Sequence, residues 1–434
     1  MPSQRADHAF LPRGWAADHT VPVAAGGSDA VAWRLTGLPN LHSHAFQRAM
    51  AGLAERQSHP EDSFWTWREL MYRFAGRITP EALHAIASQL YVEMLEAGYT
   101  SVCEFHYLHH QPDGRPYDDA AEMSNALIAA ARDTGLRLTL LPVLYMSGGF
   151  DGRPLSERQR RFGHTLEAYQ ALLSALRARA GDTLAVGIAL HSLRAVPEGP
   201  MRELLDDVGD TPMPIHIHIA EQIGEVQDCL ALRGARPVEW LLDHAPVDAR
   251  WTLVHATHLE PSEVRGIVAS GATVALCPTT EANLGDGLFP LRDYLQAGGH
   301  WGIGSDSHVS VSPVEELRWL EYGQRLVTRR RNIAVSATQS STGELLYAQA
   351  LQGGLRACGQ PGAADDFIVL DAQAPALAGA TRDDLLDRWV FAGNRSLVQE
   401  THVAGQRLVS GGRHRDRDAV AAGYVRAMRT LLAS

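Results

Sequence analysis

Two short histidine patterns in the chain have the spacing of metal ligands. His42 and His44 stand two residues apart after an apolar run, and His216 and His218 repeat that spacing further along. In a β-strand, residues i and i+2 point to the same face, so each pair can present two imidazoles to one point. Imidazole nitrogen is a ligand for zinc and for other transition metals. The patterns therefore raise the hypothesis of a metal centre, although a lone His-x-His pair is weak evidence.

Further metal-type and acid–base residues end other apolar runs. Glu221 stands three residues after His218, where its carboxylate could project over the same metal, while His255 and Asp306 each close an apolar segment. The chain has 20 histidines, and any one of these sites alone would favour ordinary core or surface residues. All four sites lie at the C-terminal ends of expected strands, where barrel active sites form. We expect His216, which lies deeper in its strand, to be a packed histidine beside the centre.

Eight apolar, β-rich segments are expected to position these residues. The expected strands are 33–41, 100–105, 137–144, 184–190, 214–219, 251–254, 273–276 and 301–304. Helical patterns between them cover 80–97, 120–134, 166–178, 201–208, 223–232 and 261–270. Eight strands that alternate with helices predict an α/β fold, a (β/α)8 barrel with a closed parallel sheet.

The two ends of the chain differ from this pattern. Residues 1–34 and 364–411 contain short alternating segments with turns, so we expect them to pair and form a small β-sandwich domain rather than two loose tails. The barrel is then expected at 35–363. Residues 412–434 are expected to add a closing amphipathic helix, clearest from residue 416 onward.

Composition excludes several partners and one kind of metal site. The formal net charge of −11 argues against nucleic acid or an anionic membrane, because both need a basic surface. No apolar run reaches the roughly 18–20 residues that span a bilayer. The N-terminus has no signal-peptide pattern, so we expect a cytoplasmic location.

The basic residues and the cysteines narrow the type of metal site. All 39 basic residues are arginine, so a carboxylated lysine that bridges two metals is impossible and a single metal is favoured. The four cysteines are scattered, which predicts neither a disulfide framework nor a thiolate zinc site.

The order of these motifs resembles the mononuclear deaminase branch of the amidohydrolase superfamily. More narrowly, LPNLHSHAFQRAMAGL at 38–53 and FWTWRELMY at 64–72 resemble the formimidoylglutamate deiminase family, and the resemblance runs from about residue 35 to the C-terminus. It implies hydrolysis of N-formimino-L-glutamate to N-formyl-L-glutamate and ammonia in histidine degradation. It also implies a homodimer.

The resemblance implies a role for each residue of the centre. It implies four ligands for one divalent metal, zinc or alternatively iron: His42, His44, His218 and Asp306. Zinc would lower the pKa of its bound water towards about 7. Glu221 would protonate the leaving imino nitrogen, Asp306 would take the proton of the attacking water, and His255 would orient that water or stabilise the tetrahedral centre.

A small-molecule substrate with two carboxylates needs a buried arginine capable of bidentate pairing. Arg194 follows the fourth expected strand, and Arg68 lies in the Trp-Thr-Trp-Arg segment. Both resemble family positions that hold the acidic groups of the substrate, and Gln47, Tyr107 and His191 resemble its remaining polar contacts. Which arginine binds which carboxylate stays open.

Two other functions stay open. A related deaminase could act on a nucleobase, on which Trp65 and Trp67 could stack. A catalytically silent metal-binding barrel could serve as a scaffold, although the presence of both Glu221 and His255 argues against it. Ammonia release from N-formimino-L-glutamate would distinguish the expected deiminase from a nucleobase deaminase. Metal content without turnover would support the scaffold.

Overall fold

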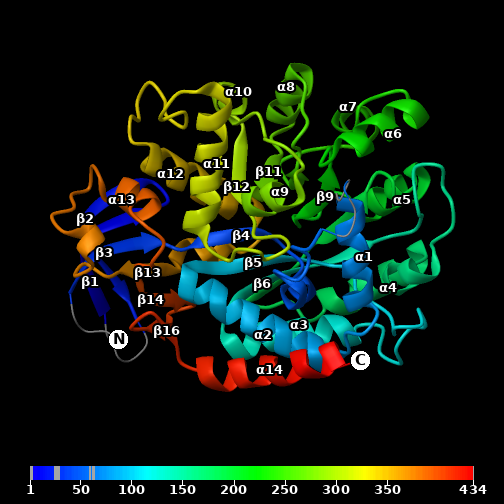
Figure 1. The fold of residues 1–434 in the computed structure, drawn as a ribbon, viewed down its shortest axis with the longest axis horizontal. Coiled ribbons are helices and arrows are strands. Elements are labelled where there is room, and N and C mark those ends of the chain that lie inside the picture. The colour runs from blue at the N-terminus through cyan, green and yellow to red at the C-terminus, as the bar shows by residue number, and fades with distance from the viewer. Residues whose placement is uncertain (1–2, 24–29, 58–59, 61–63, 434) are drawn as a thin grey trace.

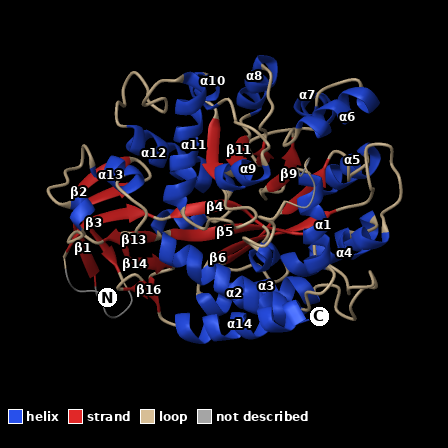
Figure 2. Cartoon of the chain, in the orientation of Figure 1, coloured by secondary structure: helices blue, strands red, loops and turns tan. Residues whose placement is uncertain are grey.

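Parallel strands close into a barrel at the centre of the computed structural model, which describes residues 3–23, 30–57, 60 and 64–433 (Figures 1 and 2). The strands of the barrel are β4 (Leu38–Ser43), β5 (Tyr99–His106), β6 (Arg137–Leu144), β7 (Leu184–Val186), β8 (Ile188–Ser192), β9 (Ile215–Ile219), β10 (Trp251–His255), β11 (Thr273–Leu276) and β12 (His300–Ile303). β7 and β8 are separated only by Gly187, and together they correspond to the fourth strand of the barrel. Pairing of β12 with β4 and of β5 with β6 closes the sheet, which confirms the expected (β/α)8 barrel.

The first expected strand, 33–41, is wrong as a single element. It divides at Gly37 into β3 (Val31–Thr36), which belongs to a second sheet, and β4 of the barrel. The Gly37 N–H donates to the carbonyl oxygen of Asp366 at 2.9 Å. A Cβ at this position would lie 2.1 Å from Cγ2 of Thr100, so only glycine lets the chain pass between the sheets here.

Both ends of the chain build the second sheet, which lies beside the barrel at the left of Figure 1. Its order is β16-β15-β14-β13-β3-β1-β2, with β1 (Ser3–Leu11), β2 (Gly14–Pro22), β13 (Phe367–Leu370), β14 (Val398–Val403), β15 (Gln406–Ser410) and β16 (Arg413–His414). N-terminal β3 pairs antiparallel with C-terminal β13, so the two ends hold each other. The division of the chain into domains stays a prediction. The C-terminal helix begins at Arg417 rather than at 412, because β16 precedes it.

Helices cover the outside of the barrel. They are α1 (Phe64–Ala75), α2 (Pro80–Ala97), α3 (Glu122–Thr134), α4 (Leu166–Arg177), α5 (Glu198–Val208), α6 (Ile223–Arg233), α7 (Pro237–His244), α8 (Pro261–Ser270), α9 (Pro278–Leu284), α10 (Leu291–Gln296), α11 (Pro313–Thr328), α12 (Thr342–Ala357), α13 (Leu385–Phe391) and α14 (Arg417–Ala433). Local signals set their bounds: the Thr79 hydroxyl caps α2, and Gly98 ends it in the left-handed conformation. α14 lies along α2 (Figure 1). Within the described residues, no helix combines the length and the apolar character that a membrane span needs.

Candidate metal centre and active site

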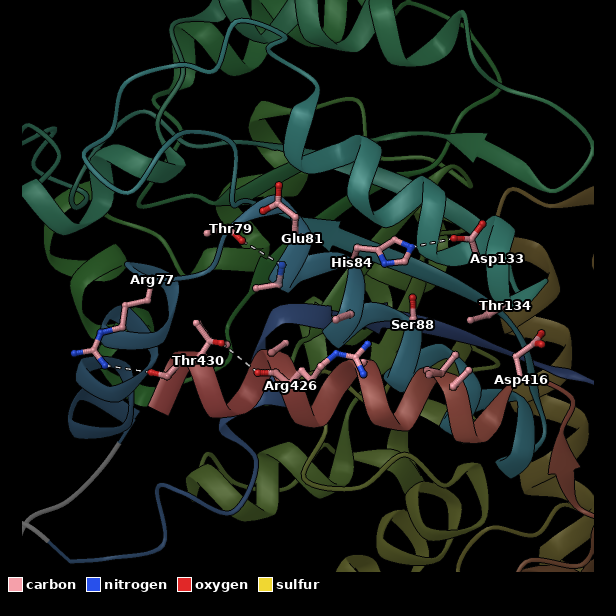
Figure 3. A pocket seen from close by; sticks show the side chains of 17 residues that line it. Arg77, Thr79, Glu81, His84, Ser88, Asp133, Thr134, Asp416, Arg426 and Thr430 are labelled. Carbon is pink, nitrogen blue, oxygen red and sulfur yellow. Dashed lines mark hydrogen bonds and ion pairs between the residues drawn. The ribbon is translucent and has the colours of Figure 1, made fainter. Parts of the chain in front are cut away.

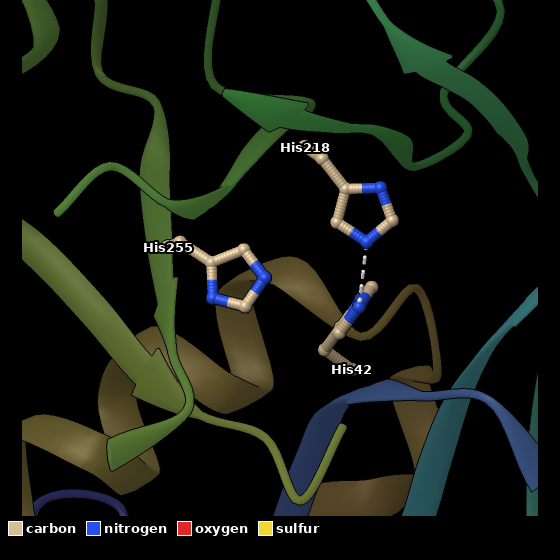
Figure 4. A group of neighbouring side chains, drawn as sticks. All are labelled: His42, His218 and His255. Atoms are coloured by element: carbon tan, nitrogen blue, oxygen red, sulfur yellow. Dashed lines mark hydrogen bonds between the residues drawn. The ribbon is translucent and has the colours of Figure 1, made fainter. Parts of the chain in front are cut away.

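Three imidazole nitrogens and one carboxylate converge at the C-terminal ends of the barrel strands. Nε2 of His42 lies 3.1 Å from Nε2 of His44 and 3.0 Å from Nε2 of His218, and Figure 4 shows His42 and His218 facing each other. Oδ1 of Asp306 lies 3.4 Å from Nε2 of both His42 and His44. His218, the most exposed of the four residues, is only 8% exposed. The structure thus brings the four expected ligands together from β4 and the residue after it, from β9, and from the residues after β12.

Hydrogen bonds on the far side of two rings fix which nitrogen faces the centre. Nδ1 of His44 donates to the carbonyl oxygen of Phe105 at 2.8 Å, and Nδ1 of His218 donates to that of His191 at 3.0 Å. Their Nε2 atoms therefore carry lone pairs. Burial lowers the pKa of both rings and of His42, so all three stay neutral, as metal ligands must.

The four distances given above fit one divalent metal. Lone pairs and a carboxylate that face one another at 3.0–3.4 Å repel unless a cation lies between them. Four ligands at about 2.0–2.1 Å from a tetrahedral zinc stand about 3.3 Å apart, which is close to these distances. The donor set, nitrogen and oxygen only, suits zinc and also tolerates iron.

The backbone holds the centre in place at some conformational cost. The Asp306 N–H donates to the carbonyl oxygen of His42 at 3.0 Å, and the His44 N–H donates to that of Asp306 at 3.2 Å. Asp306 and His255 have φ angles of +46° and +69°, and Ala220, next to Glu221, has +49°. Such left-handed backbone costs roughly 1–3 kcal/mol per non-glycine residue and concentrates at functional sites. The turns after β9, β10 and β12 therefore aim the side chains of the site.

Glu221 and His255, the residues expected to carry out acid–base chemistry, lie beside the metal-type centre. Nε2 of His255 lies 3.8 Å from Oε1 of Glu221 and 3.9 Å from Oδ2 of Asp306. Burial raises the pKa of Glu221 to about 7, assisted by Asp306 and opposed by His255 and Arg194. Burial lowers the pKa of His255, but the carboxylates around it, above all Glu221, raise it overall to about 10. Glu221 can therefore hold and release a proton near neutral pH.

A narrow cavity next to this centre gathers the expected substrate-binding residues. Its walls include all five of them: Gln47, Arg68, Tyr107, His191 and Arg194. Nε2 of Gln47 donates to the Tyr107 hydroxyl at 2.9 Å. Burial and both arginines lower the pKa of His191, which places the two guanidinium groups near one neutral imidazole. Trp67 also lines the cavity, whereas the side chain of Trp65 lies outside the described part of the structure.

Several residues of the site were not expected from the sequence. Tyr72, on α1 beside Trp67 and Arg68, and Tyr145 line the same cavity. Tyr145 directly follows β6, and that strand-end position was an available signal. Glu281, on α9, lies behind His255, with Oε1 3.2 Å from Nδ1 of the ring. No sequence pattern linked those two residues.

Cavity size alone would point to another place. A cavity of about 730 Å³ lies between α2 and α14, compared with about 60 Å³ at the metal-type centre (Figure 3). Its lining includes His84, Asp133 and Arg426 but none of the expected site residues. The three groups of metal-type side chains found in the described part of the chain all include His42 or His255. Chemistry rather than volume identifies the site.

Comparisons with known proteins show the family to which the chain belongs. A model of the amidohydrolase family matches residues 35–359. Formimidoylglutamate deiminase from Pseudomonas aeruginosa is 52% identical over 450 residues, which cover 98% of this chain and 99% of that protein. The crystal structure of an amidohydrolase from Brucella melitensis matches with a TM-score of 0.94 and 45% identity over all of both chains. An adenosine deaminase from Xanthomonas campestris with bound zinc shares the fold, with a TM-score of 0.78 and 20% identity over 100% of this chain and 98% of that one. The chain therefore belongs to the amidohydrolase family, as a hydrolase of C–N bonds.

Proposed function

We propose that the protein catalyses the hydrolytic deimination of N-formimino-L-glutamate to N-formyl-L-glutamate and ammonia. The observation that carries the proposal is that one cavity joins the metal-type centre and Glu221 to two arginines, Arg68 and Arg194. The 52% identity to a formimidoylglutamate deiminase supports the same substrate.

The metal is the first part of the proposal. Four side chains would hold one zinc ion, or alternatively iron: His42, His44, His218 and Asp306. When bound, the metal would lower the pKa of a water molecule at this site towards about 7, so that a strong nucleophile would be available at neutral pH. The support is the convergence of the four donor atoms and the neutrality of the three imidazoles.

Proton transfers fall to the side chains around the metal. Water adds its oxygen to the formimino carbon, and the bond from that carbon to the terminal nitrogen breaks. Asp306 accepts one proton of the attacking water, and Glu221 delivers its own proton to the imino nitrogen. The proton held by Asp306 then reaches the same nitrogen, and the hydroxyl proton returns to Glu221 as the carbonyl forms, so that neutral ammonia leaves and both carboxyl groups regain their starting states. His255 orients the water and stabilises the tetrahedral centre from Nε2, on the side that faces Glu221 and Asp306.

Substrate recognition depends on the cationic end of the cavity. Arg68 comes from α1 and Arg194 from the turn after β8, so two separate elements present guanidinium groups to one small space. Planar guanidinium groups pair with carboxylates through two parallel hydrogen bonds, which suits a dicarboxylate. Gln47, Tyr107 and His191 are the remaining polar contacts in this proposal. Because the protein carries a net charge of −11, local attraction by these arginines must overcome the overall field.

The cellular setting is also part of the proposal. We place the reaction in histidine degradation, in the cytoplasm, with the protein as a homodimer. The similarity to the Pseudomonas aeruginosa formimidoylglutamate deiminase along almost the whole chain supports the reaction itself, and the pathway, the compartment and the homodimer follow from the family resemblance of the sequence.

Ammonia release by the zinc-loaded protein tests the proposal. Wild type should release ammonia from N-formimino-L-glutamate, and Glu221→Gln and Arg194→Ala should release little. Arg132→Ala, which removes an exposed arginine of α3, serves as the matched control and should behave as wild type. Turnover of guanine or cytosine without formiminoglutamate would favour a nucleobase deaminase, and bound metal without any turnover would favour a scaffold.

A further inference from the structure

A buried carboxylate lies behind His255, outside the substrate cavity. Glu281 is 4% exposed and does not line the cavity. Its Oε1 lies 3.2 Å from Nδ1 of His255, while Nε2 of the same ring faces Glu221 and Asp306 at 3.8 and 3.9 Å. Figure 4 shows this ring beside His42 and His218. Glu281 therefore contacts the one edge of the imidazole that does not face the reaction.

Hydrogen bonds at the start of α9 restrict the movement of the Glu281 carboxylate. α9 begins with Pro278, which has no N–H, and Oε1 of Glu281 accepts the N–H of Cys277 at 3.0 Å. The Thr279 N–H and hydroxyl are bound by another buried carboxylate, Glu316, at 2.9 and 2.6 Å. With the first turn of α9 anchored twice, Glu281 has little freedom to leave His255.

We propose that Glu281 is a positioning residue that sets the ring orientation of His255, an inference that rests on the proposed function. A carboxylate can only accept a hydrogen bond, so it selects the ring with a proton on Nδ1. That choice turns Nε2 towards the centre and excludes the ring rotated by half a turn, in which carbon would face the water. Glu281 acts through His255 and touches neither substrate nor metal ligands.

The backbone of His255 explains why such a support is needed. Its φ of +69° and that of Ala256, +48°, are sparsely populated conformations for residues with side chains. Strained backbone persists only where surrounding contacts overdetermine it. The Glu281 contact is one such constraint, and it links the turn after β10 to the helix after β11.

Glu316 provides a matched control for this role. It is also fully buried, and it also binds the first turn of α9, through Thr279 rather than through His255. Removing either carboxylate should disturb α9. Only the loss of Glu281 should change the reaction through His255.

The test is a double-mutant cycle on the zinc-loaded enzyme. Glu281→Leu should lower kcat by about 10–100-fold, with KM within about twofold and zinc content unchanged. In a His255→Ala background, the same substitution should lower kcat by less than about threefold, because its partner is already gone. Glu281→Gln, which keeps an accepting oxygen, should recover part of the loss, and Glu316→Gln should leave kcat within about threefold.

Each other outcome decides the question. An equal loss of kcat with and without His255 would show a structural role and overturn the proposal, as would unchanged kcat in Glu281→Leu. If Glu281→Leu does not fold, Glu281→Gln takes its place in the cycle. If His255→Ala has no measurable turnover, an equal loss of kcat in Glu281→Leu and Glu316→Leu overturns it. The wild-type substrate is determined separately, so the cycle can use whichever amidine or nucleobase the wild type deaminates.

Discussion

Replacing Glu104 with glutamine should change how the stability of the protein depends on pH. Glu104, on β5, is 2% exposed, and its oxygens accept the Ala45 N–H and the Ser43 hydroxyl, each at 2.6 Å. These contacts hold the end of β4 that carries His44. Burial raises the pKa of this carboxyl from 4.5 to about 8, although both hydrogen bonds lower it.

The sign and the size of the effect follow from that pKa. Above pH 4.5 the unfolded chain loses this proton, while the folded protein keeps it until about pH 8. The contribution of Glu104 to stability is therefore complete below about pH 4.5, is lost progressively as the pH rises from there, and is gone above about pH 8. Between pH 6 and pH 9 only the roughly two units below the folded pKa count, so at about 1.36 kcal/mol per unit the loss is about 2.5 kcal/mol. Glutamine does not titrate and should show none of it.

Urea unfolding at pH 6, 7, 8 and 9, followed by tryptophan fluorescence, measures this difference. Wild type and Glu104→Gln are compared at the same zinc concentration, so that protons linked to metal binding cancel. The difference in unfolding free energy should shift by about 2.5 kcal/mol in favour of the variant as the pH rises. Glu203→Gln, at an exposed site on α5, should run parallel to wild type. Parallel curves for Glu104→Gln would refute a protonated, buried Glu104.

Further results are expected. A chelator should abolish turnover, and added zinc should restore it. His218→Ala should bind zinc more than about 100-fold more weakly in an indicator competition, because a proposed metal ligand is lost. Unchanged zinc affinity would remove His218 from the metal site. In steady-state assays, Arg68→Ala and Arg194→Ala should each lower kcat/KM by about 30–1,000-fold. The reason is that about 2–4 kcal/mol of binding free energy is lost when a desolvated carboxylate loses its partner. A loss below about threefold would exclude that arginine from carboxylate binding. The buried Arg137 guanidinium lies 2.5 Å from the Asp366 carboxylate. Asp366→Ala should lower the free energy of unfolding, measured in urea, by about 3–5 kcal/mol, because the guanidinium loses its counter-charge. A loss below about 1 kcal/mol would show that this link between the barrel and the second sheet adds little to stability.

The barrel could be predicted because strand periodicity and strand ends are local signals. The His42 and His218 patterns each follow β-rich runs, and parallel strands bring their C-terminal ends to one edge. Position along the strand distinguishes the expected metal ligand, His218, from His216. His218 reaches the centre, whereas His216 is fully buried within β9 and belongs to none of the metal-type groups found among the described residues.

Features that depend on contacts between distant segments could not be predicted. The apolar run through Gly37 continues without interruption, and the change of sheet is decided by Thr100 and Asp366, which lie far away in the sequence. Glu281 and His255 are 26 positions apart in the sequence, and they make contact only because the fold places α9 next to the end of β10. The candidate catalytic residues at strand ends could therefore be predicted from the sequence, whereas the contact by which Glu281 supports His255 could not.

Product analysis for the zinc-loaded wild type with N-formimino-L-glutamate tests the proposed function most directly. Ammonia and N-formyl-L-glutamate should form in equal amounts, and no product should form after the metal is removed. Absence of ammonia from formiminoglutamate, together with ammonia release from guanine or cytosine by the same preparation, would contradict the proposed function.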